Sequence, residues 1–132
     1  MVLVVLGVAV AAAATILWYL DRRYQVSVGD ITVIDADTIK TKEKGRIRFK
    51  NCDAPEWFET GGDIAAQRLI TLVKNAKRLG ITYDEPPRRD WFLRWLGILW
   101  IDGEDACAIL IREKLACPWQ KRRPRPRPPD CR

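Results

Sequence analysis

The sequence contains no histidine among its 132 residues. This absence excludes histidine acid–base catalysis, zinc sites built on imidazole, and nucleophiles activated by a neighbouring imidazole. The four cysteines, Cys52, Cys107, Cys117 and Cys131, include no Cys-x-x-Cys pair, which argues against a structural zinc site. Carboxylates are therefore the natural bases and metal ligands of this chain.

Charged side chains are absent from residues 1–20, which are rich in valine, leucine and alanine. A helix of ~20 residues, rising ~1.5 Å per residue, matches a hydrocarbon layer of ~30 Å, so we predict a single-pass membrane anchor. A cleaved signal peptide is the alternative, because Ala11–Ala14 offers small residues to a peptidase, although no Lys or Arg precedes the apolar run. The anchor leaves the side of the membrane undecided, whereas cleavage would give a secreted or periplasmic protein.

The central part of the chain has no strong excess of charge. The net charge is +6, but residues 121–132 hold six of the 23 basic residues and only one of the 17 acidic residues. A folded domain before this segment must therefore bind any anion through a few placed arginines and not through a broad basic field. In residues 121–132 arginine alternates with proline, a pattern that does not build packed elements and predicts an extended, disordered tail.

Short strands are predicted between residues 24 and 85, where apolar residues alternate with turn signals such as Gly29-Asp30 and Lys44-Gly45. Helical spacing follows over residues 63–79, with Asp63 as the expected N-cap and Gly80 as the expected stop. The remaining predicted elements are strands over residues 81–84 and 95–101 and a helix over residues 104–116. A chain of this length has room for one such domain, and the pattern predicts an α+β fold with a small barrel.

Four short segments hold acids and arginines in an order that suits phosphodiester hydrolysis. This reaction needs a hard cation, an activated water, and fixed positive charge around the phosphorus. Aspartates offer hard oxygens for Ca²⁺, a glutamate can act as base, and arginines can clamp a phosphate. The segments are Asp35-Ala36-Asp37-Thr38, Arg46-Ile47-Arg48, Asp53-Ala54-Pro55-Glu56 and Asp90-Trp91-Phe92-Leu93-Arg94.

In these segments the sequence resembles the staphylococcal nuclease (thermonuclease) family. The family's Asp-Gly-Asp-Thr turn is similar to residues 35–38, and its Asp-x-x-Gly-Arg is similar to residues 90–94. Its arginine followed five residues later by Asp-x-Pro-Glu is similar to Arg48 with residues 53–56. The resemblance covers residues 24–120. It implies a monomeric, Ca²⁺-dependent nuclease acting on DNA or RNA, folded as a five-stranded OB-fold β-barrel with about three helices.

The resemblance also implies a role for each matching residue. Asp37, Asp53 and the backbone carbonyl of Ala54 are expected to hold Ca²⁺. Glu56 is expected to activate or position the attacking water, and Arg48 and Arg94 to bind the phosphate. Two aromatic residues, Trp91 and Phe92, are candidates for stacking on a base.

The sequence departs from the family pattern at two glycines. Ala36 stands between the two acids of the first motif, which penalises a positive φ at that position. Leu93 stands directly before the last arginine, where it could alter how Arg94 reaches the site. The five charged side chains of the expected site are nevertheless all present.

Further expectations rest on the family's fold and on the basic tail. The fold implies that Cys52 and Cys117 are neighbours, so a disulfide between them is predicted, which requires an oxidising compartment. A non-catalytic OB-fold module that binds single-stranded nucleic acid, with affinity supplied by the tail, is the alternative function. A third possibility is a membrane interaction protein whose Arg-Pro tail binds anionic lipid or a proline-recognition domain.

Overall fold

The computed structural model describes residues 2–23, 25–84, 88–121 and 124–132. Tyr24 and Glu85, which bound the strand-rich region predicted above, and Arg122 and Arg123 of the predicted tail lie outside the described residues. The fold is mixed α+β, as the sequence predicts. Its helices are α1 (Val2–Arg23), η1 (Val28–Asp30, a 3₁₀ turn), α2 (Gly62–Asn75) and α3 (Ala106–Arg112). Its strands are β1 (Ile31–Asp35), β2 (Thr38–Thr41), β3 (Gly45–Phe49), β4 (Cys52–Asp53), β5 (Leu79–Tyr83), β6 (Trp95–Ile101), β7 (Glu104–Asp105) and β8 (Cys117–Pro118).

The main sheet has the strand order β1-β2-β3-β6-β5, with β7 paired to β6. The first three strands are antiparallel, and β3 pairs in parallel with β6. The segment before β1 meets β5 at one bridge, Gln25–Gly80, but the 3₁₀ turn at Val28–Asp30 separates that bridge from β1. Within the described residues no sheet closes into a barrel, so the predicted five-stranded barrel is confirmed only as far as a mixed α+β fold.

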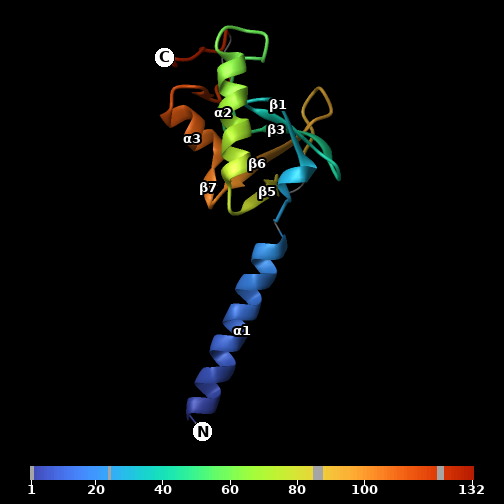
Figure 1. Cartoon of the computed structure of the whole chain (residues 1–132), viewed down its shortest axis with the longest axis vertical. Coiled ribbons are helices and arrows are strands. Elements are labelled where there is room, and N and C mark those ends of the chain that lie inside the picture. The colour runs from blue at the N-terminus through green and yellow to red at the C-terminus, as the bar shows by residue number, and fades with distance from the viewer. Residues whose placement is uncertain (1, 24, 85–87, 122–123) are drawn as a thin grey trace.

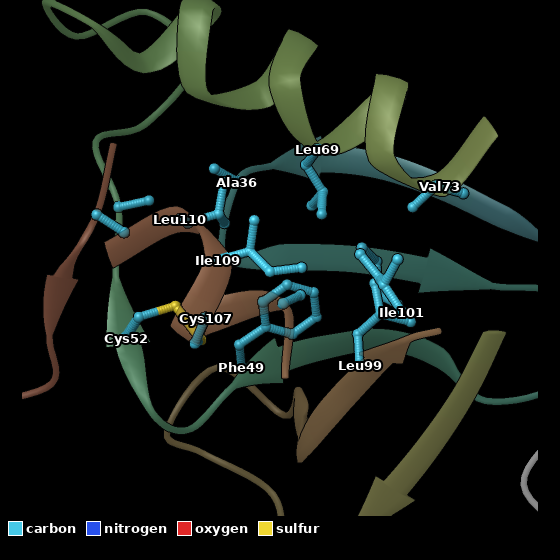
Figure 2. Close-up of a cluster of buried hydrophobic side chains, with 14 of the residues drawn as sticks. Ala36, Phe49, Cys52, Leu69, Val73, Leu99, Ile101, Cys107, Ile109 and Leu110 are labelled. Atoms are coloured by element: carbon cyan, nitrogen blue, oxygen red, sulfur yellow. A yellow bond between two sulfur atoms is a disulfide. The ribbon is translucent and has the colours of Figure 1, made fainter. Parts of the chain in front are cut away.

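The hydrophobic core lies between the sheet and the helices α2 and α3. Leu69 and Val73 of α2 point toward the strands, and they meet Phe49 and Leu99 in a layer that α3 also joins (Figure 2). Burying a large apolar side chain contributes ~1.5–3 kcal/mol, so these contacts hold α2 against the sheet. The apolar side chains Leu69 and Val73, which contribute to the helical spacing of residues 63–79, therefore belong to the core.

The ends of α2 differ from the prediction. Gly61, with φ at 81°, takes the N-cap position that we predicted for Asp63, and Asp63 lies in the first turn. The helix ends at Asn75, so the prediction of Gly80 as its stop is wrong, since Gly80 belongs to β5. The backbone amides that follow the helix donate to Asp102, which turns the chain into the strand.

The N-terminal helix α1 projects away from the rest of the chain (Figure 1). Its side chains over residues 2–17 are exposed. Within the described residues, no helix combines the length and the apolar character needed to cross a membrane. The membrane anchor over residues 1–20 stays a prediction.

All four cysteines form disulfides, Cys52–Cys107 and Cys117–Cys131, so the predicted Cys52–Cys117 bond is wrong. Strands β4 and β8 do lie side by side, but Cys117 is opposite Asp53, one residue out of register with Cys52. Since successive side chains of a strand point to opposite faces, the two cysteines face away from each other. Cys52 instead meets Cys107 of α3 (Figure 2).

Candidate active site

Arg48 brings together two of the predicted metal ligands. Its Nη2 donates to Asp53 Oδ1 at 2.9 Å, and its Nη1 lies 3.1 Å from Asp37 Oδ2. Nη1 also donates to the carbonyls of Phe49 at 3.0 Å and Cys52 at 2.9 Å. Pairing of β2 with β3 places Arg48 opposite Thr38, directly beside Asp37. The β2–β3 hairpin and strand β4 thus bring together residues that lie apart in the sequence.

Asp37 is almost completely buried, with 3% of its surface exposed. Its Oδ2 accepts from the Ala54 amide at 2.7 Å, and its Oδ1 accepts from the Thr38 hydroxyl at 3.0 Å. Burial raises the pKa of Asp37 above its usual 3.8, against the opposing effect of the Arg48 charge and of these hydrogen bonds. Further positive charge nearby would stabilise the ionised form of this carboxylate.

Glu56 lies beside the same acidic cluster. A hydrogen bond with Asp35, partial burial, and the charges of Asp35, Asp37 and Glu59 raise the pKa of Glu56 to about 7. Asp35 in turn accepts from the Trp57 amide at 2.8 Å, which ties the Glu56 loop to the end of β1. A carboxylate with such a pKa is suited to accept a proton near neutral pH.

Gly62 lets the start of α2 approach this loop. A side chain at residue 62 would overlap the carbonyl oxygen of Glu56 and crowd the Cα of Trp57. The position of Glu56 thus depends on a glycine that the sequence motifs did not single out. The short loop from Glu56 to Gly62 is further closed by the amides of Glu59 and Gly62, which donate to the carbonyls of Glu56 and Glu59.

The two departures from the glycine pattern have different outcomes. Ala36 is fully buried and is not among the described residues with a positive φ, so its methyl group carries no such penalty. Leu93 has φ at 61°, in the left-handed region that favours glycine, and 73% of it is exposed. The strain predicted at Ala36 is therefore absent, whereas the leucine before Arg94 adopts the backbone that a glycine would take.

Arg94 is held mainly by Asp90. Its Nε and Nη2 lie 2.8 and 2.7 Å from Asp90 Oδ2, and its Nη1 lies 3.4 Å from the Thr38 hydroxyl. Burial would raise the pKa of Asp90, but the hydrogen bonds and charge of Arg94 lower it below its usual value. Thr38 therefore links Arg94 to Asp37, which places the second predicted arginine at the same site.

A cavity of about 450 Å³ opens beside these residues. Arg48 and Arg94 line it together with Trp91 and Phe92, which are 94% and 75% exposed. The two aromatic rings predicted to stack on bases thus border the cavity that holds the two predicted phosphate ligands. The Phe92 ring also lies 5.3 Å from the Arg94 guanidinium, a cation–π distance.

Sequence reasoning missed two arginines that reach the site from the C-terminal segment. Arg127 Nη1 donates to Asp53 Oδ2 at 3.0 Å, and Arg125 Nη1 lies 3.8 Å from Asp53 Oδ1. The alternation of Arg and Pro predicted a tail, whereas the Cys117–Cys131 disulfide closes this segment into a loop. The even number of cysteines was the one signal of such a closure.

The oxygens of Asp37 and Asp53 are the hard donors that Ca²⁺ prefers, and both residues are buried. The described residues contain no group of three or more acidic, cysteine or histidine side chains arranged to hold a metal ion. The two aspartates therefore fit a cation that takes its remaining ligands from backbone, water or phosphate oxygens. They do not fit a cation that is held by side chains alone.

Comparisons with known proteins give two relatives of interest. "Endonuclease YncB" of Bacillus subtilis (strain 168) is 33% identical over 92 residues, which cover 63% of this chain and 43% of that protein. "SPbeta prophage-derived endonuclease YokF" of the same organism is 31% identical over 99 residues, covering 66% of this chain and 33% of that protein. The chain thus spans less than half the length of either curated relative. No protein-family model matches the chain.

Proposed function

We propose that this chain is a Ca²⁺-dependent nuclease of the staphylococcal nuclease type that hydrolyses phosphodiester bonds of DNA or RNA and acts as a monomer. The observation that carries the proposal is the position of Arg48 between Asp37 and Asp53, beside the cavity that Arg94 also lines. Two relatives whose names call them endonucleases support the same activity.

The proposed chemistry assigns a separate task to each charged side chain. Glu56, with a pKa of about 7, accepts the proton of the attacking water. Arg48 and Arg94 supply fixed positive charge where negative charge develops on the phosphate oxygens. Trp91 and Phe92 hold the bases of a single strand by stacking on them.

A bound Ca²⁺ would be held by Asp37, Asp53 and the backbone carbonyl of Ala54, and it would supply positive charge at the phosphate. The burial of Asp37 favours this assignment, because burial raises the pKa of its carboxyl despite the opposing charge of Arg48, and a bound cation would further stabilise the ionised form. Among the described residues, Arg48 alone contacts both carboxylates at ion-pair distance.

Cleavage of a single-stranded oligonucleotide with and without Ca²⁺ tests the proposal. We expect cleavage products to form with Ca²⁺ and none to form when a chelator has removed it. Protein carrying Glu56→Gln is the matched control for a contaminating nuclease, because it keeps the shape of the side chain and loses the base. Wild-type protein that cuts neither DNA nor RNA in Ca²⁺ would contradict the proposal.

A non-catalytic nucleic-acid-binding module is the second candidate, and one observation favours it. Leu93 occupies a left-handed backbone conformation directly before Arg94, and Arg94 directs two of its nitrogens to Asp90. An arginine held in this way could bind a phosphate without reaching the transition state. Oligonucleotide binding without cleavage in Ca²⁺ is the result expected for this candidate.

We further propose that the protein works in an oxidising compartment, as the secreted or periplasmic alternative requires. Both disulfides of the structure support this location, because disulfides are rare in reducing cytosol. Mass spectrometry of unreduced peptides from native material would reveal two disulfide-linked pairs. Four free thiols would contradict the proposal.

A further inference from the structure

The C-terminal loop, residues 117–131 closed by the Cys117–Cys131 disulfide, is fixed to the site by Arg127. Arg127 donates to Asp53 at 3.0 Å and reaches Glu59 at 3.5 Å. At the other end of the loop, the Trp119 amide donates to the Asn51 carbonyl at 3.1 Å. Three attachments therefore hold the loop beside the Asp53 strand.

Arg125 lies on the same loop but has few partners. It lines the cavity of about 450 Å³ that Arg48 and Arg94 also line. Its Nε is buried and has no hydrogen-bond partner among the described residues, and its closest approach to Asp53, 3.8 Å, is too long for a hydrogen bond. Its guanidinium packs near the Trp119 ring at 5.7 Å. Arg125 is thus a positioned cation with unused donors.

The cavity wall carries more basic than acidic side chains. Arg48, Arg94 and Arg125 line it, and Asp90 is the one acidic residue among the described residues that line it. Arg48 and Arg94 pair closely with Asp53 and Asp90, whereas Arg125 lies 3.8 Å from Asp53. Lys50 adds another cation to the cavity wall, although it is paired with Asp84 at 2.7 Å. An anion with several acceptor oxygens, such as a phosphate, matches the donors that remain.

We propose that Arg125 binds a backbone phosphate of the nucleic-acid strand, next to the phosphate that is cut, and that the disulfide-closed loop presents it. The inference rests on the proposed function, because it takes the cavity as the path of the strand. The ligand class is a polynucleotide with at least two phosphates. Arg127 anchors the loop, and Arg125 contacts the ligand.

Binding without cleavage tests the inference directly. Fluorescence anisotropy with a labelled oligothymidylate in EDTA measures affinity over a range of salt concentrations, using the full chain. Arg125→Ala should weaken binding about tenfold, as expected for the loss of hydrogen bonds to a charged group. It should also reduce the slope of log affinity against log salt by about 0.7, the value of one phosphate contact on a single strand.

Arg132→Ala is the matched control. It removes one charge from the same end of the chain, but the Arg132 side chain is 94% exposed and pairs with Asp130 outside the cavity. We expect its affinity and salt slope to stay at wild-type values. Equal effects of the two substitutions would show that only the total charge of the segment matters, and they would overturn the assignment of Arg125.

Opening the loop gives a second, independent variant. Cys131→Ser breaks the disulfide and keeps every arginine, so it should lose the same salt-slope contribution as Arg125→Ala. An unchanged slope would overturn the role of the loop. If wild-type protein fails to bind the oligonucleotide at all, the proposed function fails with the inference. If wild type binds and Arg125→Ala binds equally well, the inference alone fails.

Discussion

Arg48 and Arg125 reach the same carboxylate, Asp53, from two differently built regions. Arg48 comes from the central sheet, has 9% of its side chain exposed, and makes close contacts with two carboxylates and two backbone carbonyls. Arg125 comes from the disulfide-closed loop, has 29% of its side chain exposed, and leaves its buried Nε without a partner. The difference indicates that Arg48 stabilises the folded sheet region in addition to its proposed binding role, whereas Arg125 keeps donors for the proposed ligand.

The two arginines should differ most in how far their removal destabilises the folded protein. Arg48→Ala removes the ion-pair partner of the buried Asp37 and leaves Asp53 with the arginines of the loop alone, so it should lower the free energy of unfolding by ~3–5 kcal/mol. Arg125→Ala should lower it by at most ~1 kcal/mol, as for a partly exposed pair. Urea unfolding of metal-free protein measures both, and equal losses would remove the distinction between the regions.

The two disulfides also differ, in the length of chain that each one closes. Cys52–Cys107 spans 55 residues and links β4 to α3, whereas Cys117–Cys131 spans 14. The chain-entropy relation then predicts losses of ~4 and ~3 kcal/mol when each bond is removed. Thermal or urea unfolding of Cys107→Ser and Cys131→Ser proteins checks the order. A larger loss from opening the short loop would mean that this loop, too, carries core packing.

Gly62→Ala should disturb the Glu56 loop without removing any charged side chain. The added methyl group would push on the Glu56 carbonyl, so we expect a stability loss of ~1–3 kcal/mol and a displaced Glu56 with reduced turnover. Gly61→Ala is the control, because residue 61 has room for a methyl group and bears only the strain of a left-handed φ, ~1–2 kcal/mol. If both variants keep full turnover per folded molecule, Gly62 does not position the base.

Glu56 should also make the stability of the metal-free protein depend on pH. The folded state keeps the Glu56 proton up to about pH 7, whereas an unfolded chain releases it near its ordinary pKa of 4.5. The folded state therefore binds more protons between these values, so this group makes the free energy of unfolding fall as the pH rises from 4.5 to 7. Urea unfolding in EDTA at several pH values should show a shallower fall for Glu56→Gln, and identical profiles would contradict the raised pKa.

Local patterns predicted the sheet region well. Strand β6 has the predicted bounds, and Asp37, Arg48 and Asp53, which the family resemblance groups in one expected site, lie in contact. The short turn over residues 42–44 fixes the register of β2 against β3, and this register brings Thr38 opposite Arg48.

Tertiary contacts decided what local patterns could not. The cysteine pairing depended on a one-residue register difference between β4 and β8, which no spacing in the sequence reveals. The Arg-Pro segment has no apolar pattern of its own, so its attachment to Asp53 follows only from the disulfide and from Arg127. The need for glycine at residue 62 appears only when α2 meets the Glu56 loop.

The most direct test of the proposed chemistry compares two carboxylate variants in a single-turnover cleavage assay with a calcium titration. Glu56→Gln should lower the rate by about 10² to 10⁴, the range of a positioned general base, and added calcium should not restore it. Asp37→Asn should lower the rate through weaker calcium binding, so part of the rate should return at high calcium. Equal losses in both variants, with neither responding to calcium, would contradict the division of roles between the base and the cation ligand.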